Sequence, residues 1–370
     1  MAIKKILHLT GVRELGSGQR HQLMYEVSAA KKISNVEWDT IAYHSGEAIE
    51  CFEKKIPKIF DFIILRNLFF WLILFSLRKQ YDIILFRHVS FDPFSFIFSP
   101  FINNRMGVHH AKEIDELKLV RVGWKGSLAS FVEKYTGRIA VKNSLGIVGV
   151  TEEIAVYENK ERNLNKPIFL YPNVIEVDEI SLAQDNRVKN ESHIIFICSY
   201  FSEWHGLDIL LKAIDNDDSN EKYFVHLVGN LTLDQESEIE KNKNKEKIIM
   251  HGVLTQQQYL YVASKCDIGL GSLALYRKNL DEASTLKVRE MLAMGLPVFS
   301  GHKDAAFDEN FTFYQYSQDF DLNQLLAFCK TNKELKREVV RMASKELIEK
   351  KKIMEGFIAQ ANKLTNEAES

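Results

Sequence analysis

Short runs with the pattern of buried β-strands alternate with helix patterns along almost the whole chain. In the first half, strand-like runs occupy 3–9, 36–42, 81–86, 105–108, 145–150 and 168–171, and the clearest helix patterns occupy 60–77 and 124–143. The alternation restarts near the middle, with strand-like runs at 194–197, 224–229, 248–252, 267–270 and 296–299. Strands separated by helices favour parallel sheets that are covered on both faces. The sequence therefore predicts an α/β chain built from two such units.

The length and the loop composition favour the same division. A chain of 370 residues fits two domains of ordinary size. The polar stretch 178–191, which follows Pro172-Asn173, has the composition of a domain boundary. We expect a first domain over 1–173, a linker over 174–191, a second domain over 192–345 and a terminal helix over 346–370.

Composition excludes several functional classes. A net charge of −2 without a clustered basic face gives no reason to expect nucleic-acid binding. The four cysteines are far apart, which predicts free thiols in a reducing compartment. The first residues lead directly into a strand pattern rather than into a signal peptide. The longest apolar run, 67–77, is shorter than the roughly 20 residues of a spanning helix, so we expect a cytoplasmic protein.

The stretch 281–298 combines a loop, a helix and a strand in a chemically suggestive order. Glu282 and Glu290 are separated by seven residues, and a short apolar helix pattern follows and closes at Gly295. Ser284 and Thr285 are suitable N-cap residues, so Leu286 would open the helix and its free N–H groups would face the preceding loop.

This order of residues favours the binding of a phosphorylated ligand. A helix N-terminus attracts an anion, and Lys287 adds a full positive charge, which suits a diphosphate. Glu282 lies before the helix, and Glu290, one turn inside, could accept hydrogen bonds from two ribose hydroxyls. The alternative is a solvated surface helix with an ordinary Lys287–Glu290 pair.

Two further groups stand where parallel sheets bind ligands. Gly16 and Gly18 follow the first strand and precede a helix pattern, so the backbone there could approach a phosphate, although a plain tight turn has the same pattern. His109 and His110 follow the strand 105–108, at a carboxyl end where ligands bind in such sheets. One of these imidazoles could bind a sugar hydroxyl or a phosphate, and the alternative is a structural histidine.

The stretch 281–298 resembles the E-x7-E signature of the retaining GT-B glycosyltransferases of family 4. The resemblance extends to the flanking Lys-x-x-Glu and to Ala-Met-Gly-Leu-Pro-Val, and nearly the whole second half can be aligned with the family pattern. It implies two Rossmann-like domains that face each other across a cleft, with the C-terminal helix returning to the first domain. It also implies that Glu282 lies beside the donor sugar, that Ser284, Thr285, Leu286 and Lys287 bind sugar and diphosphate, and that Glu290 holds the ribose.

The first half carries weaker resemblances to the same family. The Gly16-Ser17-Gly18 segment is similar to a loop that faces the donor, which would place Arg20 near the phosphates. A histidine often lies close to the reacting sugar in this family, and His109 is preferred over His110 because it directly follows the strand. One departure concerns two basic residues that the family usually places on the phosphates: here Ser199 and His205 are nearest to those positions.

The resemblance implies transfer of a sugar from a nucleotide-sugar, with UDP-sugars favoured over GDP-sugars, and with retention at the anomeric carbon. Glu282 has no evident carboxylate partner about 5 Å away, which disfavours a hydrolase-like double displacement. No Asp-x-Asp motif follows a strand, so we expect no metal and no cofactor beyond the donor.

The resemblance also implies a glycan acceptor, lipid-linked, in surface polysaccharide synthesis such as that of lipopolysaccharide or capsule. The aromatic stretches 69–75 and 91–101 are either core or a peripheral contact with the cytosolic face of the membrane. The alternatives are a nucleotide-sugar epimerase or phosphorylase on the same fold, and a non-catalytic partner of a transferase.

Overall fold

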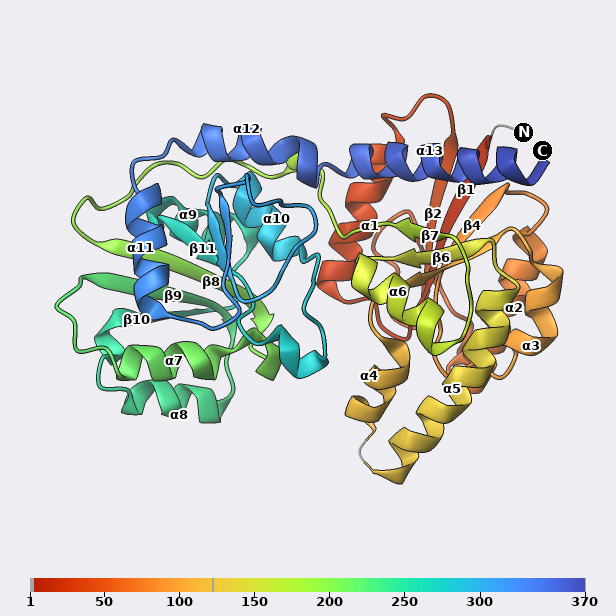
Figure 1. Cartoon of the computed structure of the whole chain (residues 1–370), viewed down its shortest axis with the longest axis horizontal. Coiled ribbons are helices and arrows are strands. Elements are labelled where there is room, and N and C mark those ends of the chain that lie inside the picture. Colours follow the sequence, from red (N-terminus) through yellow and green to blue (C-terminus); the bar gives the residue numbers. More distant parts are fainter. Residues whose placement is uncertain (1–2, 122, 370) are drawn as a thin grey trace. The chain divides into compact units, whose positions relative to one another are not determined.

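The computed structural model of the chain describes residues 3–121 and 123–369. It divides into two compact units, one formed by Met1–Val174 with Lys350–Ser370 and the other by Ile175–Glu349 (Figure 1). The second unit is therefore inserted between two segments of the first.

The first unit contains a seven-stranded sheet in the order β3-β2-β1-β4-β5-β6-β7, in which neighbouring strands are parallel. The strands are β1 Lys5–Gly11, β2 Glu37–His44, β3 Glu53–Lys55, β4 Ile83–Arg87, β5 Arg105–His109, β6 Gly146–Gly149 and β7 Ile168–Leu170. The helices are α1 Ser17–Ala30, α2 Ile63–Leu77, α3 Ser95–Phe98, α4 Glu113–Val120, α5 Trp124–Lys142, α6 Glu152–Glu161 and α13 Lys350–Glu369.

The C-terminal helix α13 completes the core of the first unit. Its residues Met354, Phe357 and Ala361 are buried at helical spacing, against strands β1, β4 and β5. The Phe357 ring lies 6.0 Å from the ring of Trp38, and Asn362 Oδ1 accepts a hydrogen bond of 2.8 Å from the Ile3 N–H. The two ends of the chain therefore meet in one unit.

The second unit contains a six-stranded parallel sheet in the order β10-β9-β8-β11-β12-β13. The strands are β8 Ser192–Tyr200, β9 Tyr223–Asn230, β10 Ile248–Gly252, β11 Ile268–Leu270, β12 Val298–Ser300 and β13 Tyr314–Tyr316. The helices are α7 Leu207–Asp215, α8 Leu233–Lys241, α9 Gln256–Lys265, α10 Leu286–Ala293, α11 Leu322–Asn332 and α12 Arg337–Ile348.

Helix α7 shows why the second unit folds as the sequence pattern indicates. Leu207, Leu210, Leu211 and Ile214 recur at i, i+3, i+4 and i+7, and all four are buried in the core of this unit. The segment 175–183, within the expected linker, is part of the same unit. Its residues Ile175, Val177 and Ile180 are buried, and the Ile175 N–H donates to the Ile348 carbonyl at 3.1 Å.

The long apolar helix of the first unit, α2, packs one face into the protein core, while Ile63, Ile64 and Leu72 of the same helix are exposed. Phe70, Trp71 and Leu74 of α2 are buried against the sheet. Among the described residues, no helix is both long enough and apolar enough to cross a membrane.

Candidate functional site

The second sheet has a topological switch point at β8. This strand pairs with β9 on one side and with β11 on the other, so the chain leaves β8 toward one side of the sheet and leaves β11 toward the other. Sheets of this kind bind ligands in the crevice at the carboxyl ends of the strands at such a point. The loop after β8 ends in a 3₁₀ turn, Glu203–His205, followed by Gly206 at φ 74°. A Cβ atom at Gly206 would lie 2.8 Å from Leu273 Cβ, and the Leu273 N–H donates to the His205 carbonyl at 2.9 Å. The close approach of the two loops therefore requires glycine here.

Lys287 extends from the first turn of α10 to this crevice. Its Nζ lies 3.5 Å from Cys198 Sγ, near the end of β8, and 5.2 Å from the centroid of the Phe196 ring. Burial raises the pKa of the Cys198 thiol, although the Lys287 charge opposes that shift, so the thiol is neutral. Among the described residues, no carboxylate lies within 4 Å of Lys287 Nζ. The crevice therefore contains a cation that the unit itself does not neutralise.

His205 stands beside Lys287 as a neutral hydrogen-bond donor. Burial lowers its pKa to about 3, and the charges of Lys287 and Lys278 add to the effect. Its Nδ1 accepts a hydrogen bond of 3.0 Å from the Ser202 N–H, so the ring proton of the neutral form is on Nε2. His205 thus offers the crevice an N–H group rather than the partial charge expected from its unperturbed pKa. Ser199, the other substitute for a basic residue, is exposed at the end of β8.

Helix α10 begins without a side-chain cap. Thr285 has the extended backbone of an N-cap residue, but its side chain makes no capping hydrogen bond, and its buried Oγ1 has no partner among the described residues. In contrast, Thr151, Thr232 and Thr255 each cap their own helices through Oγ1. Ser284 precedes it and is buried, and Leu286 is the first helical residue. The N-terminal turn of α10 therefore keeps its capacity to bind an anion.

Glu282 is held by the backbone of the segment that follows β12. It forms a β-bridge with Lys303, the Ala283 N–H donates to the Lys303 carbonyl at 2.9 Å, and the Lys303 N–H donates to the Asp281 carbonyl at 2.9 Å. The Arg289–Asp304 ion pair, with Arg289 fully buried, fixes α10 to the same segment. The position of the Glu282 backbone is thus set from both sides.

His302 belongs to this crevice although no sequence motif indicated it. It is buried two residues after the end of β12, and burial lowers its pKa to about 4, with Lys287 among the charges that contribute. Its Nδ1 lies 2.7 Å from Ser300 Oγ and 3.3 Å from the Ser272 carbonyl, while its Nε2 is buried without a hydrogen-bond partner among the described atoms. No local sequence signal marks His302, because it is neither in a motif nor next to the end of a strand.

Glu290 lies one turn further along α10, half-buried and next to helix α9. Burial raises the pKa of Tyr259 on α9, and the charge of Glu290 raises it further, which shows that the two groups are neighbours. The neighbouring α10 residues Val288, Met291 and Leu292 are buried. Helix α10 is therefore packed against the unit rather than solvated on all sides.

The expected donor loop of the first unit has open surroundings. A Cβ atom at Gly16 would meet nothing closer than Gln19 Oε1 at 3.9 Å, and one at Gly18 would meet no atom within 4 Å. Neither glycine has a positive φ. Neither internal packing nor backbone conformation therefore requires glycine at these two positions.

Arg20 is engaged within the first unit. Its Nε donates to Glu53 Oε1 at 2.5 Å, and Glu53 also binds His44 Nε2 at 2.9 Å and the Ile49 N–H at 3.1 Å. Burial acts to raise the pKa of Glu53, but these partners outweigh it and hold the pKa at about 2. The charge of Arg20 is thus balanced by a carboxylate on β3.

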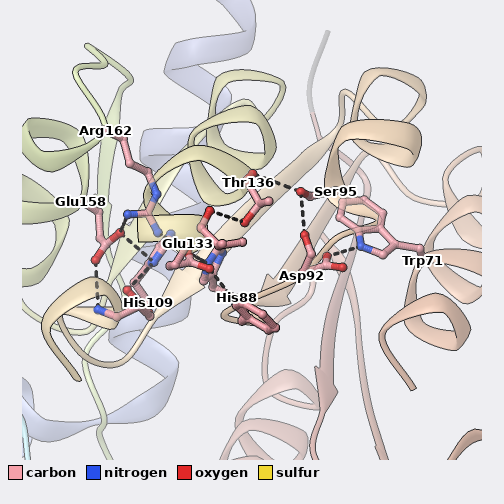
Figure 2. Close-up of polar contacts among 12 residues, drawn as sticks. Trp71, His88, Asp92, Ser95, His109, Glu133, Thr136, Glu158 and Arg162 are labelled. Carbon is pink, nitrogen blue, oxygen red and sulfur yellow. Dashed lines mark hydrogen bonds and ion pairs between the residues drawn. The ribbon is translucent and has the colours of Figure 1, made fainter. Parts of the chain in front are cut away.

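His109 is fully buried at the end of β5, inside a network of charged groups (Figure 2). Its Nδ1 lies 3.0 Å from Glu113 Oε2, and its ring stacks on His88 with centroids 4.6 Å apart. Burial lowers its pKa to about 3, with the charge of His88 contributing, so the ring is neutral.

The network continues through Glu133, which binds His88 Nε2 at 2.8 Å and Arg162 Nη2 at 2.6 Å. Arg162 also pairs with Glu158 at 2.5 Å. His109, Glu113 and Glu158 are the one set among the described residues whose ligand atoms are close enough for a metal ion. The Arg162 guanidinium already supplies a positive charge to Glu158, so a cation there would face a second cation.

The structure thus brings His205, Thr285 and Lys287 to one crevice in the second unit. The backbone of Glu282 is bridged to that of Lys303, and Glu290 lies next to Tyr259. Within the first unit, Arg20 and His109 belong to separate networks.

No protein-family model and no curated protein sequence matches this sequence. Solved structures do match, over nearly the full length. A glycosyltransferase from Rickettsia africae ESF-5 is 14% identical with a TM-score of 0.67, and the match covers 98% of this chain and 99% of that one. The lipopolysaccharide outer core galactosyltransferase WaaB, in its apo form, is 9% identical with a TM-score of 0.63, over 96% of this chain and 99% of that one.

A third match is Anabaena Alr3699/HepE in complex with UDP and glucose. It is 12% identical with a TM-score of 0.56, and the match covers 99% of both chains. At these identities the likeness concerns the fold. With two parallel sheets wound in the same order, the chain has the GT-B fold of two Rossmann-like domains.

Proposed function

We propose that this protein is a glycosyltransferase that binds a nucleotide-sugar in the crevice of its second unit and transfers the sugar with retention of anomeric configuration. The observation that carries the proposal is the Lys287 ammonium, which lies at a helix N-terminus and a switch point without a carboxylate partner among the described residues. A partly buried cation in such a place is stabilised when an anion binds, and the diphosphate of a nucleotide-sugar is an anion of suitable size.

In this proposal the protein binds the diphosphate through three kinds of group. Lys287 supplies the charge, His205 donates from Nε2–H, and the uncapped first turn of α10, from Thr285 and Leu286, supplies N–H groups. These groups are already in place before the ligand binds, so they can stabilise the charge that develops on the departing diphosphate. The proposal needs no metal and no cofactor other than the donor itself.

The carboxylates would hold the rest of the donor. Glu290 would accept hydrogen bonds from the ribose hydroxyls, and Glu282 would orient the sugar. The unpartnered Nε2 of His302 could accept a further bond from a sugar hydroxyl. As the bond between the anomeric carbon and the diphosphate oxygen breaks, the acceptor oxygen bonds to the same face, and its proton passes to the departing diphosphate.

The similar structures support the choice of substrates. HepE was solved with UDP and with UDP-glucose, WaaB is a lipopolysaccharide outer core galactosyltransferase, and the similar structure WaaG is a glycosyltransferase involved in lipopolysaccharide biosynthesis. We therefore propose a UDP-sugar before a GDP-sugar, and a glycan acceptor carried on a lipid at the cytosolic face of the membrane. The contacts that we predict between the first domain and the donor remain those of Gly16, Gly18, Arg20 and His109. To reach a phosphate, Arg20 would have to break its ion pair with Glu53.

Thermal unfolding with UDP, GDP or ADP, each with magnesium or with EDTA, tests the donor site. A nucleotide at ~100 times its dissociation constant adds about 2.7 kcal/mol of stability. We expect one nucleotide to stabilise the protein selectively, with EDTA leaving the shift unchanged. Loss of the shift in EDTA would contradict the metal-independent site.

Incubation with the matching nucleotide-sugar and a lipid-linked glycan tests the reaction. We expect Glu282→Gln to keep the nucleotide shift and lose transfer, whereas Glu309→Gln, an exposed residue, keeps both. A free sugar or a sugar phosphate as the product would indicate the epimerase or phosphorylase class instead.

A non-catalytic partner protein is the second candidate, and the residues at two positions favour it. Ser199 is uncharged and His205 is neutral, so Lys287 alone supplies a full charge among these three residues. This candidate predicts no stabilisation by any of the three nucleotides.

A further inference from the structure

Helix α5 of the first unit has its large apolar side chains on the outside. Five of them follow one another at spacings of three or four residues and are between 37 and 72% exposed: Trp124, Leu128, Phe131, Tyr135 and Ile139. Such spacing places them on one face of the helix, along its whole length. The opposite face is buried and consists mostly of small or polar residues: Gly126, Ala129, Ser130, Glu133, Gly137 and Ala140. We call the five exposed residues the α5 stripe.

The buried face prevents the helix from turning the α5 stripe inward. Glu133 is held inside by His88 and Arg162, and the Phe91 N–H donates to it at 2.6 Å (Figure 2). A Cβ atom at Gly137 would lie 2.3 Å from Glu133 Oε1 and 2.7 Å from Arg162 Nη2, so the helix packs closely over this ion network. The buried ion pairs of Glu133 fix the rotation of α5 about its axis. The α5 stripe is on the opposite face and is therefore exposed.

Neighbouring elements extend the apolar surface. Helix α4 packs beside α5 (Figure 1), and its last residues, Leu119 and Val120, are exposed. Ser95 Oγ of α3 donates to the Thr136 carbonyl of α5 at 3.1 Å, and Phe96 and Ile97 of α3 are exposed as well. Two apolar residues of the aromatic stretch 91–101 are thus exposed on a helix that contacts α5.

The exposed charges of α5 itself are positive. Lys125, Arg138 and Lys142 are exposed, and none has an ion-pair partner among the described residues. Arg138 and Lys142 follow Phe131 and Tyr135 by seven residues each, so they lie on the same face. The only carboxylate of α5, Glu133, is buried. The face presented to solvent is therefore apolar and cationic, without an exposed carboxylate of its own.

We infer that the α5 stripe, with the end of α4, docks on an anionic lipid surface. Tryptophan and tyrosine favour the boundary between hydrocarbon and water, and cations beside them favour anionic headgroups. A helix of this kind lies in the plane of the interface rather than spanning the bilayer. Docking does not require a nucleotide, so the inference stands independently of the proposed transfer reaction, although a lipid-linked acceptor would be reached from the same surface.

Flotation of the full-length protein with vesicles tests the inference. The vesicles would contain phosphatidylcholine alone or with 30% phosphatidylglycerol, a composition chosen for the test, at about 50 and about 300 mM salt. We expect binding to the anionic vesicles, weaker at the higher salt because the charges are screened. We expect Phe131→Ser with Tyr135→Ser to lower binding at least tenfold, because two aromatic anchors are lost. Leu233→Ser, which removes an exposed leucine in the second unit, is the matched control and should bind normally.

The charges have their own test. Arg138→Gln with Lys142→Gln should lower binding to anionic vesicles roughly fivefold per cation and flatten the salt dependence. Unchanged thermal unfolding would show that each variant is folded. Absence of vesicle binding at low salt would overturn the inference. So would a dimer in size-exclusion chromatography that Phe131→Ser with Tyr135→Ser converts to a monomer, since a second copy would then cover the stripe.

Discussion

The two units share a strand order but use their charged side chains differently. In the first unit, two of the buried cations are paired with carboxylates: Arg162 with Glu133 and Glu158, and Lys350 with Glu26 at 3.2 Å. In the second unit, Lys287 faces a thiol and an aromatic ring instead. Folds of the same topology thus hold ion-paired cations at one site and, at another, a cation without a carboxylate partner among the described residues.

This difference separates charges that hold a fold from charges that await a ligand. A buried ion pair contributes little net stability when it is intact, but the removal of one partner is costly because the other charge stays buried and unpaired. Removal of an unneutralised cation has the opposite effect. The folded unit no longer bears the desolvation cost of an unpaired charge, and only the affinity for the ligand falls. Substitutions at Arg162 and Lys287 should therefore have opposite consequences.

The largest effect is expected from Arg162→Leu. This change leaves Glu133 and Glu158 buried without their cation, which should lower the free energy of unfolding by about 3–5 kcal/mol. Urea unfolding followed by circular dichroism measures the loss. Arg277→Leu is the control, because its pair with Asp208 is exposed and should contribute less than about 1 kcal/mol. Equal losses of unfolding free energy in the two variants would show that the buried ion pair of the first unit contributes no more than an exposed one.

Lys287→Met should leave the free energy of unfolding unchanged or slightly higher. Loss of a charge-assisted contact with the diphosphate should weaken nucleotide binding by about 1.5–3 kcal/mol, roughly 10- to 150-fold. Isothermal titration with the stabilising nucleotide measures this, and Lys241→Met on the exposed helix α8 is the matched control. A variant that binds nucleotide normally would place the diphosphate elsewhere.

Two glycines sharpen the comparison between packed and open positions of the first unit. Gly137→Ala would drive a methyl group into the Glu133–Arg162 pair and should cost about 1–3 kcal/mol of stability. Gly18→Ala adds a methyl group to open space inside a helix and should stabilise by up to about 1 kcal/mol. Thermal unfolding measures both, and nucleotide binding should weaken only in Gly18→Ala if the donor approaches that loop. A destabilised Gly18→Ala would show that this glycine has a structural role.

The smallest effect concerns a row of histidines in the second unit. His226 Nε2 lies 2.9 Å from His193 Nδ1, and His226 Nδ1 lies 2.9 Å from His251 Nε2. Burial lowers the pKa of His226 to about 3, with the charges of both neighbours adding to the effect. The unfolded chain, with a pKa near 6.5, binds the proton first as the pH falls, so His226 lowers stability below about pH 6.5 and down to about pH 3.

His226→Gln should reduce the slope of unfolding free energy against pH by up to about 1.4 kcal/mol per pH unit in that window. Urea unfolding between pH 4 and 7 measures the slope. His21→Gln serves as the control, because this exposed histidine of the first unit has a lowered pKa but no such row of imidazoles around it. An unchanged slope in His226→Gln would mean that the three histidines bind a proton in the folded protein without loss of stability.

The alternation of strand and helix patterns predicted both sheets, because the spacing of apolar residues along a segment indicates which of its residues are buried. The long helix was expected over 124–143 and extends over Trp124–Lys142. Its orientation was not predictable, because periodicity reveals an apolar stripe without revealing which way it faces. In α5 the inward face is chosen by Glu133 and Gly137, which meet Arg162, a residue distant in sequence.

The site shows the same limit. Lys287 and the start of α10 were readable from local order, since a helix N-terminus has a short signature. Tyr259 and His302 were not, because they reach the site from other elements through tertiary packing. His109 at a strand end was readable as a position, whereas the network around it includes Glu133, Glu158 and Arg162, which come from two later helices and their ends.

The insertion of the second unit between β7 and α13 has a consequence for biosynthesis. Domains generally fold as they leave the ribosome, the N-terminal one first. Here Ile175–Glu349 can close its sheet while the first unit still lacks Phe357 over Trp38 and Lys350 beside Glu26. The order of completion along the nascent chain is therefore reversed, and a chain that had emerged from the ribosome only as far as residue 349 would carry a finished second unit and a first unit with an open core.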